Sequence, residues 1–238
     1  MKAAIIAAGK GERLARGGGT MAKPLVKICG EPLISRVIRA AWSVDVTSIA
    51  CIINELSPEL DEYLRSNPWP VPLDVVKKTT DNSMESLLTL APMLADEPFV
   101  LFTVDSVFTF TTLKKFLARA RALPDVRGAL ALTRFVDDEK PLWVMIDKAR
   151  RIKAIGEEAR TSPYVTAGFY YFDPAIFDLA GQAAKKRLKA LRQFLGLLLE
   201  SGYGLCGIPV SKTIDVDYPG DIEKAEAYLR RAGRRCSP

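Results

Sequence analysis

The sequence predicts an α/β fold, in which a mixed, mostly parallel β-sheet is flanked by helices to give three layers. In the first half of the chain, apolar runs of strand length alternate with segments of helical periodicity, which is the pattern of βαβ units. In the second half several strands follow one another directly, which indicates that some of them run antiparallel. The 238 residues contain no internal repeat and no linker, so we expect a single domain over 1–238.

Four apolar strands are expected in the first half, and a helix follows each of them. The dipeptide Ser57-Pro58 is expected to cap and open the second helix, since proline is favoured at the first helical position. Asn82 and Glu85 have capping-box spacing, which indicates a helix that begins at Asn82. The strands are expected over 2–8, 48–54, 73–77 and 99–104, and the helices over 32–41, from 57, from 82 and over 112–123.

The second half is expected to add six short strands and two helices, bounded by turn residues. The last helix is amphipathic and has a proline at its start. Together with the first half, these elements predict a Rossmann-like mixed sheet. The strands are expected over 128–134, 143–147, 151–155, 164–172, 205–210 and 213–216, and the helices over 188–199 and 219–231.

Composition excludes several kinds of chemistry. With 48% hydrophobic and 26% charged residues, the chain is typical of a globular protein with a sizeable core. It contains no histidine, which excludes Ser-His-Asp and Cys-His nucleophile systems, a histidine base and histidine-ligated zinc. The four cysteines form no C-x-x-C pair. Cys29, Cys51 and Cys206 lie in or beside apolar runs, so we expect them to be buried, reduced thiols.

The net charge of +6 comes from two local clusters. The segment 183–192 holds five basic residues and 230–235 holds four, with no acid in either. Without these nine charges the net charge would be −3, so we place the basicity on a solvated helix face and a frayed end, and expect no nucleic-acid partner. No apolar stretch approaches the ~20 residues of a membrane span, and the chain does not start like a signal peptide. We therefore expect a cytoplasmic protein without membrane insertion.

A glycine-rich loop directly follows the first strand and reads Ala7-Ala8-Gly9-Lys10-Gly11-Glu12-Arg13-Leu14. Glycines at this place let backbone N–H groups approach phosphate oxygens. The loop lacks the third glycine of a dinucleotide-binding motif, and no P-loop motif occurs in the chain. Its two glycines alone are equally consistent with a plain tight turn. Arg13 and Lys23, held in the same loop region, favour a phosphate site of another kind.

Together with several later segments, this loop resembles the sugar-1-phosphate nucleotidyltransferases and their relatives that act on other phosphorylated alcohols. That family has an Ala-Ala-Gly-x-Gly-x-Arg-Leu loop followed by Pro-Lys-Pro-Leu and a short helix. The resemblance covers nearly the whole chain in the family's order. The matching segments are 7–14, Ala22-Lys23-Pro24-Leu25-Val26, Gly30-Glu31-Pro32-Leu33-Ile34, Thr103-Val104-Asp105, Thr166-Ala167-Gly168-Phe169-Tyr170 and 214–222.

The resemblance implies a GT-A-like nucleotidyltransferase fold, an NTP and a phosphorylated small-molecule acceptor as substrates, and Mg²⁺ as the cofactor. The acceptor would be a sugar phosphate, an inositol phosphate or phosphocholine. The implied site residues are Arg13 and Lys23 for catalysis, Asp105, Asp215 and Asp217 for the metal, Ala8, Gly9, Gly11, Asn82, Ser83 and Ser86 for the nucleotide, and Thr166 and Gly168 for the acceptor.

Elementary chemistry supports the same function. In nucleotidyl transfer an acceptor phosphate oxygen attacks the α-phosphorus of an NTP and displaces pyrophosphate in line. Because that oxygen is already anionic at neutral pH, no general base is needed, and a chain without histidine can carry out the reaction. Lys23 and Arg13 would supply fixed positive charge, and Mg²⁺ would need carboxylate oxygens.

Carboxylates occur where such a metal is expected. Asp105 ends an apolar strand, at the edge where open α/β sheets bind ligands. Asp215 and Asp217 are two residues apart on a short strand, so both should point to one face. Asp217 also lies just before a predicted helix, where an acid favours the helix dipole. Asp215 is therefore the better candidate for a metal ligand.

Two other functions remain open at this point. A GT-A-type glycosyltransferase would use an Asp-x-Asp pair at the end of the mid-chain strand, but the sequence there is Asp105-Ser106-Val107. A non-catalytic nucleotide-binding or regulatory module would bind nucleotide without turnover. Its support is the segment 156–159, which contains no lysine where many sugar nucleotidyltransferases have Glu-Lys-Pro. The sequence leaves open the nucleobase, the acceptor and the oligomeric state.

Overall fold

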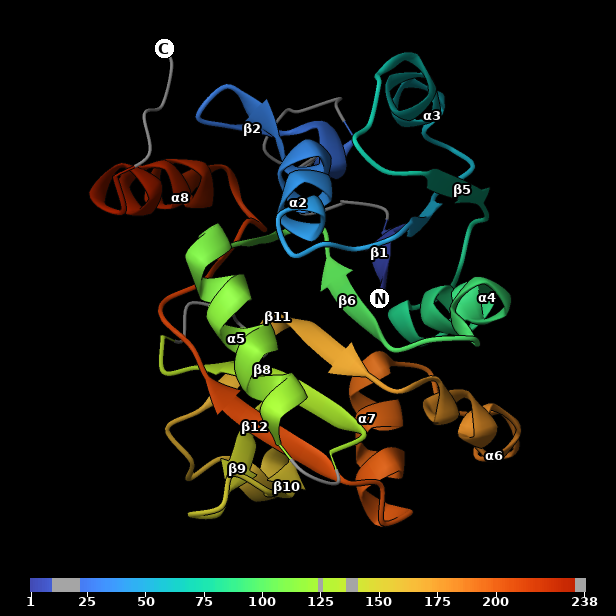
Figure 1. The fold of residues 1–238 in the computed structure, drawn as a ribbon, viewed down its shortest axis with the longest axis vertical. Helices are drawn as coiled ribbons and strands as arrows, with labels where there is room; N and C mark the ends of the chain where they lie inside the picture. Colours follow the sequence, from blue (N-terminus) through green and yellow to red (C-terminus); the bar gives the residue numbers. More distant parts are fainter. Residues whose placement is uncertain (10–21, 124–125, 136–140, 234–238) are drawn as a thin grey trace.

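The computed structural model of the protein describes residues 1–9, 22–123, 126–135 and 141–233 (Figure 1). Its centre is a seven-stranded sheet in the order β12-β8-β11-β6-β1-β4-β5. Neighbouring strands are parallel except at β11, which runs antiparallel to both β6 and β8. This confirms the predicted mixed, mostly parallel sheet. The strands are β1 (Lys2–Ala7), β4 (Ile49–Ile53), β5 (Leu73–Lys77), β6 (Phe99–Thr103), β8 (Gly128–Thr133), β11 (Val165–Phe172) and β12 (Leu205–Pro209).

Helices cover both faces of this sheet, because its central parallel strands are apolar on both sides. In β1, Ala3 and Ile5 pack into one core while Ala4 and Ile6 pack into the other. The three predicted layers are therefore present. No helix in the described ranges is long and apolar enough to cross a membrane. One face is covered by α2 (Leu33–Trp42), α3 (Pro58–Ser66), α5 (Phe110–Ala122) and α8 (Pro219–Arg231), the other by α4 (Ser83–Leu94), α6 (Ala180–Lys185) and α7 (Leu191–Glu200).

Short elements complete the fold and were partly missed by sequence periodicity. The antiparallel pair of β7 and β13 matters most, because it ties the chain just after Asp105 to Asp215. Each strand of the β2–β3 and β7–β13 pairs is only two residues long, which is too short to show the alternating apolar pattern of a strand in the sequence. The short elements are β2 (Lys27–Ile28), β3 (Glu31–Pro32), β7 (Ser106–Val107), β9 (Val144–Ile146), β10 (Ile152–Ile155), β13 (Ile214–Asp215), and the 3₁₀ helices η1 (Lys23–Leu25), η2 (Glu157–Ala159) and η3 (Pro174–Leu179).

The starts of α3 and α4 agree with the predicted helix starts, except for the capping role expected of Ser57. Asn82 caps α4, since its Oδ1 accepts the Glu85 N–H at 3.0 Å. Pro58 is the first residue of α3, as expected. The Ser57 side chain makes no capping hydrogen bond. Instead, its backbone carbonyl accepts the first N–H groups of α3.

The basic segment 183–192 does not form one helix face, contrary to the prediction. Helix α6 ends at Lys185, and α7 begins only at Leu191 rather than at residue 188. Between them the chain turns, and Arg187 adopts a positive φ of 52°. The turn separates Arg192 from the other four basic residues and places it at the start of α7.

Two of the three cysteine predictions are confirmed. Cys51 and Cys206 are buried free thiols, and burial raises the pKa of Cys51 to about 12. The prediction is wrong for Cys29, which is partly buried and disulfide-bonded. It lies in the exposed turn between β2 and β3, where a neighbouring apolar residue does not imply burial.

Core packing on the α5 face generates a stability prediction. Phe116 is fully buried and meets the Phe169 ring edge-on, with 5.1 Å between centroids. We expect Phe116→Ala to lower the free energy of unfolding by about 3–5 kcal/mol, because it removes apolar contacts and leaves a cavity. The neighbouring Lys115→Ala, on the exposed side of α5, should change it by less than ~0.5 kcal/mol. Urea unfolding measures both, and equal effects would contradict the packing described.

Candidate active site

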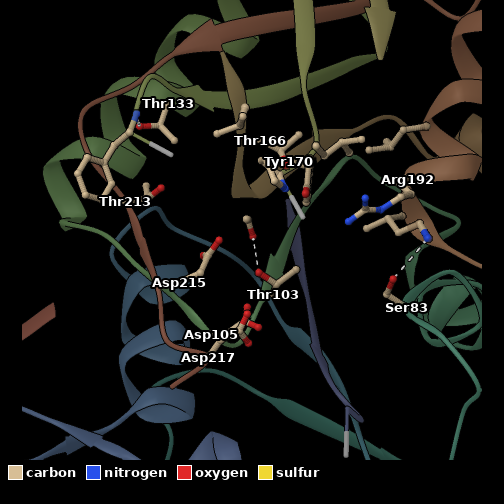
Figure 2. A pocket seen from close by; sticks show the side chains of 17 residues that line it. Ser83, Thr103, Asp105, Thr133, Thr166, Tyr170, Arg192, Thr213, Asp215 and Asp217 are labelled. Carbon is tan, nitrogen blue, oxygen red and sulfur yellow. Dashed lines mark hydrogen bonds between the residues drawn. The ribbon is translucent and has the colours of Figure 1, made fainter. Parts of the chain in front are cut away.

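A cavity of about 260 Å³ lies where the carboxyl end of β6 meets β8, β11 and the start of α7 (Figure 2). Its lining is mostly polar side chains contributed by segments far apart in the sequence. Three carboxylates gather on one side, and Arg192 extends into it from α7 on the other (Figure 2). The polar lining residues are Ser83, Thr103, Asp105, Thr133, Thr166, Tyr170, Arg192, Thr213, Asp215 and Asp217.

The ammonium of Lys23 joins two of these carboxylates. Lys23 Nζ donates to Asp105 Oδ2 at 2.8 Å and to Asp217 Oδ1 at 2.7 Å. Burial alone would lower the pKa of Lys23, but the two carboxylates raise it well above its ordinary value. Burial likewise acts to raise the pKa of Asp105, but Lys23 holds it below its usual range. Both groups are therefore charged at neutral pH.

Asp215 and Asp217 both line the cavity, as their spacing predicted. Asp215 accepts a hydrogen bond from the Ser106 hydroxyl across the β7–β13 pair. The backbone N–H groups of Asp217 and Tyr218 donate to the Asp221 carboxylate at 3.1 and 2.8 Å. Asp221 therefore has the helix-start role considered for Asp217, and the Asp217 carboxylate faces Lys23 instead.

Gly168 allows β11 to approach the turn that carries Asp105. The register of β11 against β8 shifts between Thr166 and Tyr170, and Gly168 has a φ of +77°. A Cβ on Gly168 would lie 1.7 Å from Ser106 Oγ. Thr103 Oγ1 donates to the Gly168 carbonyl at 3.2 Å. Both Thr166 and Gly168 line the cavity, so the predicted acceptor residues lie beside the carboxylates.

Among the predicted nucleotide residues that the structure describes, Ala8 and Gly9 follow β1, and Asn82, Ser83 and Ser86 lie at the start of α4. Asn54, directly after β4, connects the ends of β1 and β5. Asn54 is buried and donates from Nδ2 to the Ala8 carbonyl at 3.2 Å. Its Oδ1 accepts from Thr79 Oγ1 at 3.1 Å and from the Leu56 N–H at 2.9 Å. Sequence reasoning missed this residue, although a polar side chain directly after the apolar β4 was a usable signal.

The two predicted serines at the start of α4 have different surroundings. Ser83 lines the cavity, and its Oγ accepts the Leu191 N–H at 3.4 Å. Ser86 is buried and shares a 2.7 Å hydrogen bond with the Thr80 hydroxyl. Ser86 therefore braces the helix start, while Ser83 reaches the cavity. Gly9 is exposed, with open space where a Cβ would be.

Two predicted residues of the glycine-rich loop, Gly11 and Arg13, lie outside the described residues. The segment 156–159, which has no lysine, does not line the cavity among the described residues. Glu157, in this segment, is highly exposed and pairs with Arg160.

The carboxylates fit the donor set that Mg²⁺ requires. Mg²⁺ in phosphate-binding sites takes one or two protein carboxylates and completes its shell with phosphate oxygens and waters. Asp105 and Asp217 each direct one oxygen to a single cation, the Lys23 ammonium. Across the described ranges no three acidic or cysteine side chains come close enough to hold a metal unaided. A metal here would therefore share the carboxylates with Lys23 and need substrate oxygens.

Comparison with known families identifies the class to which this fold and site belong. A family model described as nucleotidyl transferase matches residues 2–216, and the chain belongs to that family. Among curated proteins, the chain is 25% identical to the bifunctional IPC transferase and DIPP synthase of Aquifex aeolicus, with 95% of this chain and 51% of that protein covered. It is also 25% identical to the UTP–glucose-1-phosphate uridylyltransferase AglF of Haloferax volcanii, with 97% of each chain covered.

The chain spans about half the length of the bifunctional relatives that it matches. Solved structures share its fold. The inositol-1-phosphate CTP transferase from T. maritima aligns with a TM-score of 0.81 at 19% identity, covering 96% of each chain. A putative glucose-1-phosphate thymidylyltransferase from Bacillus anthracis aligns with a TM-score of 0.82 at 18% identity, covering 97% of this chain and 95% of that one. These likenesses confirm the nucleotidyltransferase fold that the sequence predicted.

The Lys23 ion pairs generate a stability prediction. We expect Lys23→Met to lower the free energy of unfolding by about 3 kcal/mol, because it leaves two largely buried carboxylates without their shared cation. The double variant K23M/D105N should recover part of that loss in the free energy of unfolding, since only the Asp217 carboxylate then lacks its cation. The exposed Lys27→Met serves as the control and should change stability by less than ~0.5 kcal/mol. Urea unfolding in which K23M matches wild type would contradict the expectation.

The close approach at Gly168 generates a second prediction. Gly168→Ala should destabilise the protein by about 2–4 kcal/mol, since a left-handed φ costs an alanine ~1–2 kcal/mol and the added methyl group overlaps Ser106. Gly196→Ala, where a Cβ meets open space within α7, should stabilise it by ~0.5–1 kcal/mol. Thermal unfolding distinguishes the two substitutions by the sign of the change.

Proposed function

We propose that this protein is a Mg²⁺-dependent nucleotidyltransferase that transfers a nucleoside monophosphate from an NTP to the phosphate of a phosphorylated sugar or alcohol. The observation that carries the proposal is the Lys23 ammonium between two carboxylates at the ligand-binding edge of the sheet. Family membership supports the reaction class. The names of the relatives, which include glucose-1-phosphate and inositol-1-phosphate enzymes, support the acceptor class.

In the proposed reaction an acceptor phosphate oxygen forms a bond to the α-phosphorus of the NTP, and the bond from that phosphorus to the pyrophosphate oxygen breaks. Lys23 stabilises the negative charge that the phosphates bring together, and Asn54 holds the backbone of Ala8 at the nucleotide end. Asp105, Asp215 and Asp217 are the candidate ligands that, together with phosphate oxygens and water, would hold Mg²⁺, which would supply charge neutralisation on the triphosphate. No residue has to remove a proton, in agreement with the absence of histidine.

The alternative functions have weaker support. Val107, the third residue of Asp105-Ser106-Val107, is fully buried in β7, so this strand end offers no second carboxylate for a glycosyltransferase-type Asp-x-Asp pair. A regulatory module without turnover would not need the Lys23 and carboxylate arrangement.

Pyrophosphate release tests the proposal. The four ribonucleoside triphosphates and dTTP are each combined with Mg²⁺ and with glucose 1-phosphate, myo-inositol 1-phosphate, other sugar 1-phosphates or phosphocholine. We expect one pair to release pyrophosphate and to lose activity when EDTA removes the metal. Nucleotide binding by thermal shift without release in any pair would favour the regulatory module.

Asp105→Asn tests the assignment of the site. We expect it to lower kcat by about 10²–10³-fold, because a group that organises charge around the reacting phosphates is neutralised. The control Asp96→Asn removes the same charge from an exposed position that pairs with Lys2, and should leave kcat unchanged. Equal kcat values for wild type and D105N would rule out the assignment.

A further inference from the structure

We infer that Arg192 binds the phosphate of the acceptor, on the side of the cavity opposite the carboxylates. The inference rests on the proposed function, which supplies the acceptor, and adds a residue to which neither the sequence pattern nor the family resemblance gave a role. It starts from the distribution of charge around the cavity. Among the described lining residues, three are acidic and Arg192 is the one basic residue.

The cavity belongs to the acceptor end of the site. Most of its lining comes from β8, β11, α7 and residues 213–217, with Ser83 from the start of α4 and Thr103 and Asp105 from the end of β6, whereas Ala8, Gly9 and Asn54 at the nucleotide end do not line it. An acceptor phosphate in this cavity would carry one or two negative charges and would meet Asp105, Asp215 and Asp217 on one side. It therefore needs a cation on the other side, and Arg192 lies there (Figure 2). A planar guanidinium can hold two phosphate oxygens at once.

The surrounding structure fixes the backbone that carries Arg192. The adjacent Leu191 is buried and donates its N–H to Ser83 Oγ, which connects the start of α7 to α4. Leu195, one turn further on, is fully buried in the core on the same face. Arg192 is itself exposed, but its side chain thus extends from an anchored helix start.

Neutral hydrogen-bonding groups lie beside Arg192. Burial raises the pKa of Tyr170 to about 12, and the Asp215 and Asp105 carboxylates act in the same direction. The hydrogen bond from Thr166 and the Arg192 charge act on this pKa in the opposite direction. The Tyr170 phenol is therefore uncharged at neutral pH and is hydrogen-bonded with Thr166. The guanidinium and the Tyr170–Thr166 hydroxyl pair, in which one hydroxyl hydrogen is used within the pair, offer hydrogen bonds to an anion with neighbouring hydroxyl groups.

The aromatic part of the cavity is unsuited to an acceptor that carries a quaternary ammonium, although three carboxylates lie elsewhere in its wall. Besides Tyr170, Phe135 is the one aromatic residue among the described lining residues of the cavity. Lys212 Nζ lies 3.4 Å from the centroid of the Phe135 ring, so a cation already occupies that ring face. A quaternary ammonium would have to displace Lys212 and lie in a cavity that also contains Arg192. Arg192 thus favours an uncharged sugar or polyol phosphate over phosphocholine.

Arg192→Gln tests the inference when it is compared with Lys185→Gln, which removes an equal charge from the exposed end of α6. With the active NTP, we expect R192Q to raise the KM for glucose 1-phosphate or myo-inositol 1-phosphate by about 10- to 100-fold, the effect of losing a charge-assisted hydrogen-bond pair. The KM for the NTP should change by less than about twofold. R192K should recover only part of the loss, and K185Q should match wild type.

Calorimetric binding of glucose 1-phosphate, myo-inositol 1-phosphate and phosphocholine, measured without turnover, separates this inference from the proposed function. If wild type binds a sugar or inositol phosphate and R192Q binds it at least about tenfold more weakly, the inference holds whether or not pyrophosphate is released. Equal acceptor binding or KM in wild type and R192Q overturns the inference and leaves the proposed function intact. Preferential binding or use of phosphocholine, or binding of none of the three phosphates, also overturns it.

Discussion

Lys23 connects parts of the chain that are distant in sequence, since its ammonium contacts carboxylates 82 and 194 residues further along. The Lys23 ammonium, shared by the two carboxylates, holds the end of β6 close to the segment that leads into α8. Without it, two acidic side chains would face each other in a site that, under the proposed function, also accepts a triphosphate. The β7–β13 pair and the bulge at Gly168 place further side chains beside this arrangement of charges.

The sheet order explains how the two ends of the site are kept apart. Strands β1, β4 and β5 bring Ala8, Asn54 and Thr79 together, and the Asn54 amide joins the three strand ends. The antiparallel β11, placed between β6 and β8, builds the cavity on the other side of Asp105. A mixed sheet is therefore useful under the proposed function, because a single antiparallel strand would provide a wall for the acceptor next to the proposed nucleotide end.

Sequence reasoning predicted what depends on local pattern. The seven strands of the sheet and the cap at Asn82 follow from apolar periodicity and capping chemistry, and Asp105 was placed correctly because a strand end is visible in the sequence. Arg192 was missed because it belongs to a run of basic residues that resembles a solvated helix face. The turn that separates it from Lys185 depends on packing of α7 against α4, which no local pattern reveals. Asn54 was missed for a similar reason, since its partners lie on other strands.

The two helical layers contribute differently to the candidate site. The layer of α4, α6 and α7 supplies Ser83 and Arg192, and its core is separated from the α2, α3, α5 and α8 core by the sheet itself. Lys23 and Asp217 come instead from segments adjoining the opposite layer, next to α2 and α8. Substitutions near the start of α7 can therefore accumulate without repacking the layer next to Lys23 and Asp217. Under the proposed function, this separation would let descendants of one ancestral gene diverge in acceptor choice while retaining the same transfer chemistry.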